Sequence, residues 1–371
     1  MPSMGARGSP ALVVFYGGTG STPVEAMVDS ARLAATVDAV AAARAAGIER
    51  AIVVTDDAQL ATVGPGAEVD CSTAPYHFGR RLAGVVRARG LDSVVYMGGG
   101  SVPLFAADDF AGVSARLAAG GAVTNNIYSS DLIAFPVSGA ALAVTEGVER
   151  DNSLSRALSD AGIAVESRPR NVVTQMDIDA PGDLQVLALT GQGGPRLRAH
   201  LVGLHLDTTR YARTLPLFTD RRAQILVAGR VGSQSWQYLE RETACRVRLF
   251  AEERGMEADG RGESGAARSL LGLYIEAVGI DRFFAALPQL GDAAFIDTRV
   301  LLAHLRLTPT REDRFRSDLG HWQAIADPWL CDFTRAASGA AIPVLLGGHS
   351  LMSGALMALN EHAWALTEAQ R

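Results

Sequence analysis

The sequence of 371 residues contains no lysine, so all 34 of its basic residues are arginines. This absence excludes every mechanism that needs a lysine amine, including P-loop phosphate binding, Schiff-base chemistry and protein-kinase catalysis. Acidic residues outnumber basic ones, since 40 acidic residues bring the formal net charge to -6. The chain lacks the basic surplus typical of nucleic-acid-binding proteins, and we expect neither DNA nor RNA as a partner.

Cysteine and long apolar runs are also scarce. Cys71, Cys245 and Cys331 lie far apart and none belongs to a C-x-x-C pair, which argues against a zinc site or a disulfide framework and fits a reducing compartment. No apolar run approaches the roughly 20 residues that span a bilayer. The first one, Ala11 to Tyr16, is too short for a signal peptide. We therefore expect a cytoplasmic protein with no membrane segment.

What the sequence does contain is an alternation of apolar, β-branched runs with alanine-rich helical stretches, which predicts an α/β fold. Hydrophobic residues make up 48% of the chain, and its length suggests two domains. The predicted strands are 11–16, 51–55, 93–97, 127–135, 172–178, 224–228, 246–251, 293–296 and 342–346. The predicted helices are 24–46, 78–89, 108–118, 138–147, 153–162, 183–189, 197–213, 235–243, 266–278, 282–287 and 351–366.

The best linker signal is the glycine-rich segment that begins at Thr190 and ends at Pro195. We place one α/β domain at 1–190, a linker at 191–196 and a second α/β domain at 197–371. The loop from Arg254 to Gly265 has no periodicity, and we expect it to act as a lid.

Three segments of the first half carry a resemblance. The first strand ends in Gly17-Gly18-Thr19-Gly20-Ser21, a later strand ends in Gly98-Gly99-Gly100-Ser101-Val102-Pro103-Leu104, and Asp177-Ile178-Asp179-Ala180-Pro181-Gly182-Asp183-Leu184 follows. In order and spacing they resemble the nucleotidyltransferases of the nucleotide-diphospho-sugar transferase (GT-A-like) fold, above all the molybdenum-cofactor and phospholactate guanylyltransferases. The resemblance covers Ala11 to Leu189.

The resemblance implies a three-layer domain that binds a nucleoside triphosphate and transfers a nucleotidyl group to a small phosphorylated or cofactor-precursor acceptor. The implied catalytic and Mg²⁺-binding residues are Asp177 and Asp179, since carboxylates hold Mg²⁺ against a polyphosphate. The implied nucleotide-binding residues are Gly17, Gly18, Thr19, Gly20, Ser21 and Ser101. The implied acceptor-binding residues are Asn125, Asn126 and Asp131, which have turn chemistry as an equal alternative.

The sequence departs from the family pattern at two places. No arginine and lysine follow Gly20, and Ser101 stands where the family has an aspartate. Arg80 and Arg81, on a predicted helix, are alternative sources of positive charge. A second hypothesis therefore stays open, in which a catalytically degenerate domain serves binding or homodimerisation and any chemistry lies in the second domain.

The second half matches no family that we recognise, but its predicted strands all end in polar or glycine residues. Because parallel strands deliver their carboxyl ends to one edge of a sheet, we expect these residues to form a second site, for an anionic ligand. They are Arg230, Gly232, Ser233, Glu253, Arg254, Asp297, Arg299, His349 and Ser350. The segment around Ser350 is similar to a hydrolase nucleophile elbow, but Met352 replaces its last glycine, so we expect Ser350 to start a helix and not to be acylated.

Overall fold

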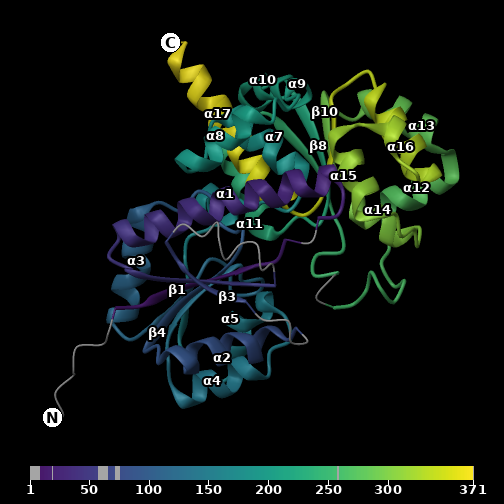
Figure 1. Cartoon of the computed structure of the whole chain (residues 1–371). Helices are drawn as coiled ribbons and strands as arrows, with labels where there is room; N and C mark the ends of the chain where they lie inside the picture. The colour runs from purple at the N-terminus through teal and green to yellow at the C-terminus, as the bar shows by residue number, and fades with distance from the viewer. Residues whose placement is uncertain (1–8, 19, 57–65, 72–75, 257–258, 371) are drawn as a thin grey trace. The chain divides into compact units, whose positions relative to one another are not determined.

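The computed structural model describes residues 9–18, 20–56, 66–71, 76–256 and 259–370 (Figure 1). Contacts among these residues divide the chain into two compact units. The first unit takes the described residues within Met1–Thr19, Asp29–Gln175 and Gly193–Leu197, and the second takes those within Gly20–Val28, Met176–Gln192 and Arg198–Arg371. Each unit has its own β-sheet, which confirms the predicted α/β class.

The first unit is built on a seven-stranded sheet in the order β3-β2-β1-β4-β6-β5-β7. The strands are β1 (Ala11–Tyr16), β2 (Arg50–Thr55), β3 (Glu68–Cys71), β4 (Ser93–Gly98), β5 (Ala122–Thr124), β6 (Leu132–Pro136) and β7 (Val165–Ser167). Strand β6 runs antiparallel to β4 and β5, and the other neighbouring pairs are parallel. The chain adds β2 and β3 on one side of β1 and then β4 on the other, so the topological switch point lies between β1 and β4.

Helices cover both faces of this sheet, because β1 is apolar at every position and its side chains alternate between the faces. Leu12 and Val14 pack with α1 and α3, and Val13 and Phe15 pack on the opposite face with α2, α4 and α5. Figure 1 shows α2 and α4 together on that face. The helices are α1 (Pro23–Ala45), α2 (Phe78–Arg89), α3 (Ala107–Ala118), α4 (Gly139–Glu146) and α5 (Leu154–Asp160).

Two predicted strands of the first half are wrong in detail. The segment 172–178 begins with a short helix, α6 (Val172–Gln175), because the Asn171 side chain caps it by accepting the Thr174 N–H at 3.1 Å. Strand β6 starts at Leu132 and not at 127, because the Asn125 side chain accepts the N–H groups of Asp131 and Leu132 and holds the preceding residues in a turn.

The second unit has a four-stranded parallel sheet in the order β11-β10-β8-β9. The strands are β8 (Gln224–Gly229), β9 (Arg246–Ala251), β10 (Ala293–Asp297) and β11 (Val344–Gly347). All four were predicted to within two residues. Here the chain adds β9 on one side of β8 and β10 on the other, so a second switch point lies between β8 and β10.

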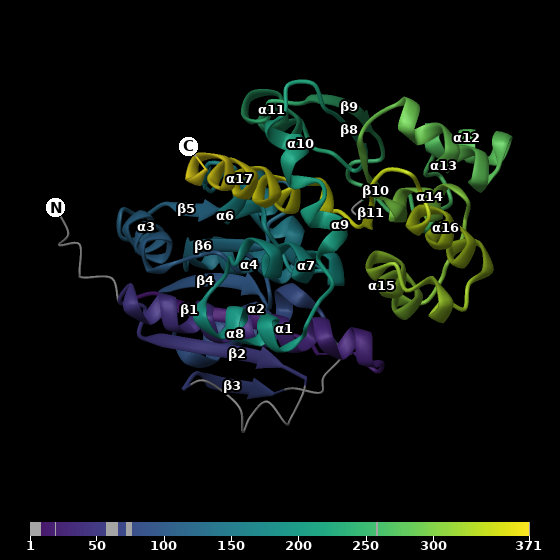
Figure 2. The same cartoon turned by 90° about the horizontal axis from the view of Figure 1, so that it is seen from above.

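Helices also lie on both sides of this second sheet (Figure 2). An apolar cluster joins one face to α12 (Leu270–Val278), α13 (Ile280–Ala286), α14 (Thr298–His304) and α16 (Pro328–Ser338). On the other face the Phe218 ring of α10 (Leu215–Thr219) lies 6.0 Å from that of Phe295. Next to α10 lies α17 (Gly354–Ala369), which also contacts α7 (Pro181–Thr190) and α11 (Ser233–Glu242).

The helix predicted over 197–213 is wrong as a single element. The chain forms α8 (Pro195–Gly203) and α9 (Thr209–Ala212), and His205 between them has a φ of 48°, which interrupts a right-handed helix. The helices α10, α14, α15 (Arg311–Leu319) and α16 were not predicted. Among the described helices, none combines the length and apolar character needed to cross a membrane.

The predicted linker 191–196 is partly fixed. The Asp38 carboxylate of α1 accepts the N–H groups of Arg196 and Leu197 at 3.0 and 2.8 Å. Gly194 packs so closely on Asp38 that a Cβ there would stand 2.4 Å from it. Residues 176–192 belong to the second compact unit. The domain limits at 190 and 197 stay a prediction.

Candidate functional site

A pocket of about 470 Å³ lies in the first unit at the carboxyl ends of β1 and β2, beside the switch point. Its size is within the range of small-molecule sites. Aromatic and charged side chains dominate its lining, namely Tyr16, Tyr76, Tyr96, Arg32, Arg81, Asp56 and Asp151.

Arg32 of α1 is positioned by the glycine-rich segments that end β1 and β4. Its Nε–H donates to the carbonyl of Gly99 at 2.8 Å, and its guanidinium lies over the Tyr16 ring at 5.9 Å. The segment after β4 must approach closely, because a Cβ on Gly99 would stand 2.7 Å from the Tyr16 ring and one on Gly100, where φ is +89°, 2.6 Å from Arg32. Arg32 therefore brings positive charge to the end of β1.

Arg81 of α2 supplies the second guanidinium of the pocket. It pairs with Asp70 of β3, which also accepts from Arg89 at 2.6 Å. Glu68 also pairs with Arg89, and with Arg50, so two carboxylates face three arginines and part of the positive charge around Arg81 stays uncompensated.

Two tyrosines complete the pocket. The Tyr96 hydroxyl is buried and donates to Asp151 at 2.8 Å, while Tyr76 has 73% of its surface exposed. Tyr76 precedes His77, whose Nδ1 accepts the Arg80 N–H and caps α2.

The residues predicted to hold the nucleotide are only partly within this pocket. Gly17 lines it, Ser101 is buried at 8% exposure after β4, and Thr19 lies outside the described residues. Gly18 belongs to the first unit, and Gly20 and Ser21 are grouped with the second.

The amides at the start of α1 already have an anionic acceptor. The Glu25 carboxylate accepts the N–H groups of Ser21 and Thr22 at 3.0 and 3.2 Å. Although desolvation opposes the shift, these hydrogen bonds lower the pKa of Glu25, so it is ionised at neutral pH. A phosphate would have to displace this side chain to use the same amides.

The predicted acceptor-binding residues have structural contacts. The Asn125 side chain donates to Asp131 and to the carbonyl of Thr174 at 3.1 and 3.2 Å, besides accepting two amides. The Asn126 side chain accepts from Arg170 at 2.6 Å. These bonds favour turn chemistry, and acceptor binding stays a prediction.

The predicted metal ligands Asp177 and Asp179 precede α7 in the second unit. Asp177 is half-buried and its Oδ1 accepts the Ile178 N–H, whereas Asp179 is exposed. The next carboxylate, Asp183, is unsuited to metal binding because it accepts the N–H groups of Asp179 and Ala180. No cluster of three or more metal-binding side chains occurs in the described part of the chain. The fit to Mg²⁺ therefore rests on two carboxylates, which suffice when phosphates and water complete the shell.

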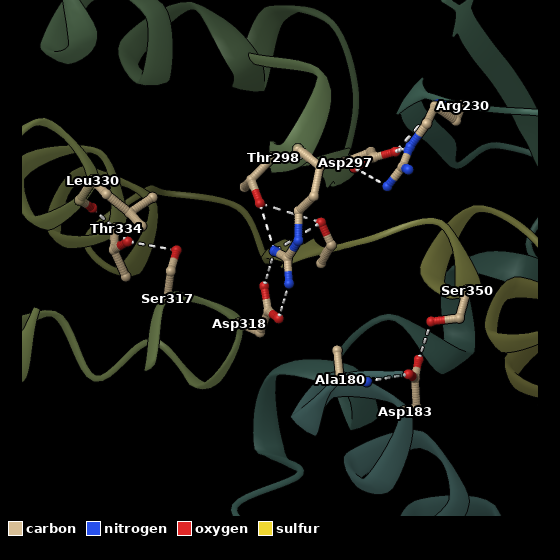
Figure 3. Close-up of polar contacts among 12 residues, drawn as sticks. Ala180, Asp183, Arg230, Asp297, Thr298, Ser317, Asp318, Leu330, Thr334 and Ser350 are labelled. Atoms are coloured by element: carbon tan, nitrogen blue, oxygen red, sulfur yellow. Dashed lines mark hydrogen bonds and ion pairs between the residues drawn. The ribbon is translucent and has the colours of Figure 1, made fainter. Parts of the chain in front are cut away.

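In the second unit, two ion pairs lie at the carboxyl ends of β8 and β10 (Figure 3). Arg230 donates to both oxygens of Asp297, at 2.6 and 3.2 Å, and the Asp297 side chain is fully buried. Gly229 makes this approach possible, since a Cβ there would stand 2.2 Å from that of Asp297.

The second pair joins the start of α14 to α15. Arg299 donates to both oxygens of the buried Asp318, at 2.6 Å each, and to the Gly347 carbonyl at 3.3 Å. His349 follows on the loop after β11, where desolvation of its imidazole together with the charge of Arg230 lowers its pKa, so the imidazole is neutral at pH 7. The structure thus brings Arg230, Asp297, Arg299 and His349 to one edge of the sheet.

Other predicted residues of the second site have separate roles. Glu253 accepts from Arg261 at 2.8 and 2.9 Å and from the Arg268 N–H at 3.0 Å, which holds the following loop. Gly232 is the N-cap residue of α11 and makes no side-chain capping hydrogen bond, and Ser233 is the first residue of that helix. Arg254 is exposed. The part of these four residues in the site stays a prediction.

Ser350 lies in a short 3-10 helix, is 3% exposed, and donates to the carboxylate of Asp183 (Figure 3). We expect a fluorophosphonate probe to leave it unmodified, because it is buried and its hydroxyl faces a carboxylate and not a histidine base. Mass spectrometry of the labelled chain, beside an active serine hydrolase as positive control, checks this. Stoichiometric modification of Ser350 would instead support a hydrolase.

Sequence reasoning missed Arg32, Tyr76 and Asp151. Arg32 occurs on a helix as an ordinary surface arginine would, and only the fold turns it toward β1. Tyr76, next to a proline in a loop, was the one available signal, since an aromatic residue there is not needed for a core.

No known family model matches the chain, and no curated protein does so either. Among solved structures, the chain is similar to the crystal structure of Rv0371c from Mycobacterium tuberculosis H37Rv, at 16% identity and a TM-score of 0.35. The match covers 49% of this chain and 97% of that one.

Proposed function

We propose that the chain is a nucleotidyltransferase-like protein whose first unit binds a nucleoside triphosphate in the pocket at the carboxyl ends of β1 and β2. The pocket lining is the observation that carries the proposal, because it combines Arg32 and Arg81 with the exposed ring of Tyr76. Guanidinium groups suit phosphate oxygens, and an aromatic ring offers a surface on which a base can stack. Open α/β sheets bind ligands at such switch points.

As a transferase, the protein would pass the nucleotidyl group to a small phosphorylated or cofactor-precursor acceptor. Asp177 and Asp179 of the second unit would hold Mg²⁺, as the resemblance implies. The two arginines of the pocket would provide the positive charge that the loop after β1 does not.

A second candidate is a domain that binds the nucleotide without transferring it, with any chemistry left to the second unit. It is favoured by Glu25, which engages the Ser21 and Thr22 amides, and by Ser101, which stands where the resemblance expects an aspartate.

Thermal unfolding of the full chain with each nucleoside triphosphate tests the binding step. A ligand at 100 times its Kd adds about 2.7 kcal/mol of stability. We expect Tyr76→Ala to weaken binding about tenfold, because base stacking contributes about 1–3 kcal/mol. Tyr128→Ala is the matched control, since Tyr128 is 64% exposed and outside the pocket lining. No stabilisation by any triphosphate would refute the proposal.

The same titrations with Asp177→Asn and Asp179→Asn separate the two candidates. Asparagine keeps the shape but removes the charge that a hard cation requires. For a transferase, both variants lose the part of the binding that depends on Mg²⁺. Binding that is equal in wild type and variants, with and without Mg²⁺, favours the binding-only protein.

A further inference from the structure

The second unit places two guanidinium groups around one glycine. A Cβ built on Gly348 would stand 3.5 Å from Arg299 Nε and 3.9 Å from Arg230 Nη2, with no closer heavy atom. These are ordinary van der Waals distances, so the position has room for a carbon atom. Both arginines therefore border the same small space, at the switch point between β8 and β10.

Both guanidinium groups are held in place before any ligand arrives. Asp297 and Asp318 have fully buried side chains, and each accepts hydrogen bonds from its arginine with both carboxylate oxygens. Fixed side chains lose little conformational entropy on binding, which favours recognition. Buried ion pairs add little to stability compared with apolar packing, so stability alone does not account for two of them at this point.

One donor faces this space without an acceptor. The side-chain hydrogen bonds of Arg299 come from its two Nη atoms, and within the described residues none comes from Nε. Nε is also the atom nearest to the Cβ position of Gly348. An N–H of a guanidinium group that points beside a glycine is suited to a ligand oxygen.

We propose that the space beside Gly348 is a binding site for the oxyanion group, phosphate or carboxylate, of a small molecule. The ligand oxygen accepts from Arg299 Nε and lies against the Nη2 edge of Arg230. Because Asp297 and Asp318 offset the charges of the two arginines, recognition depends on direct hydrogen bonds at short range. The site belongs to the second unit alone and does not depend on nucleotide binding by the first.

Gly348→Ala is the sharpest test, because its methyl group fills the space at ordinary van der Waals distances from Arg299 and Arg230, so neither ion pair needs to move. Gly203→Ala is the control, since a Cβ at Gly203 has no neighbour within 4 Å. Calorimetric titrations of the full-length variants use pyrophosphate and citrate, which distinguish a phosphate from a carboxylate ligand. Thermal unfolding of each variant shows that it is folded.

We expect wild type and Gly203→Ala to bind one of the two probes, and Gly348→Ala to bind it at least about tenfold more weakly, which corresponds to about 1.4 kcal/mol. If pyrophosphate also binds to the first unit, the titration of Gly348→Ala would still show that binding as a separate class of sites. Equal titration curves for all three proteins, or no binding of either probe to wild type, would overturn the proposal.

Discussion

Asp297→Asn is expected to lower the free energy of unfolding by about 3–5 kcal/mol, because it leaves a buried arginine without its counterion. Asparagine has nearly the same shape and can still accept the Arg299 N–H that Asp297 accepts at 3.1 Å, so the loss reflects charge and not volume. Burial works to raise the pKa of Asp297, but Arg230 outweighs it and the pKa is lowered, which keeps the pair ionised at neutral pH. Urea denaturation at pH 7 measures the effect.

Asp332→Asn provides the comparison. Asp332 pairs with Arg335 at 2.8 Å, but both side chains are more than half exposed, so its loss should change stability by no more than about 0.5 kcal/mol. Adding Arg230→Gln to Asp297→Asn should restore part of the stability, because no uncompensated charge then remains. A loss below about 1 kcal/mol for Asp297→Asn would contradict a desolvated pair.

The elements that the sequence predicted well are those with a strong local signal. Strand β1 is six consecutive apolar residues, and α2 lies between His77, which caps its start, and Gly90, whose φ of 58° ends it. Strands β5 and β7 have three residues each, too few to show a period, and they depend on pairing with distant strands.

In the second site, too, one part was predictable from the sequence and another was not. Parallel strands must end at one edge, so the meeting of Arg230, Asp297 and Arg299 followed from the pattern. Their partner Asp318 did not, because it comes from α15, nineteen positions after Arg299 and on a helix with no strand-end signal. Such a partner is fixed by tertiary packing, which no local pattern records.

Asp183 couples α7 to the loop after β11 and has an unusual protonation equilibrium. Burial, and then the nearby carboxylate of Asp179, raises the pKa of Asp183 to about 7. An unfolded aspartate has a pKa of about 3.9. Between these values the folded chain binds a proton that the unfolded chain releases. The resulting stability is fully present below about pH 4 and is lost as the pH rises through about 7.

Asp183→Asn should remove this dependence while keeping an acceptor for the Asp179 and Ala180 N–H groups. From pH 4 to pH 8, we expect the free energy of unfolding of wild type to fall relative to that of the variant by on the order of 4 kcal/mol, since three pKa units correspond to about that amount. Urea denaturation of both proteins across this range provides the comparison. All other titrating groups are common to the two proteins, so their difference isolates Asp183. Parallel curves would mean that Asp183 is ionised throughout and that its hydrogen bonds outweigh its burial.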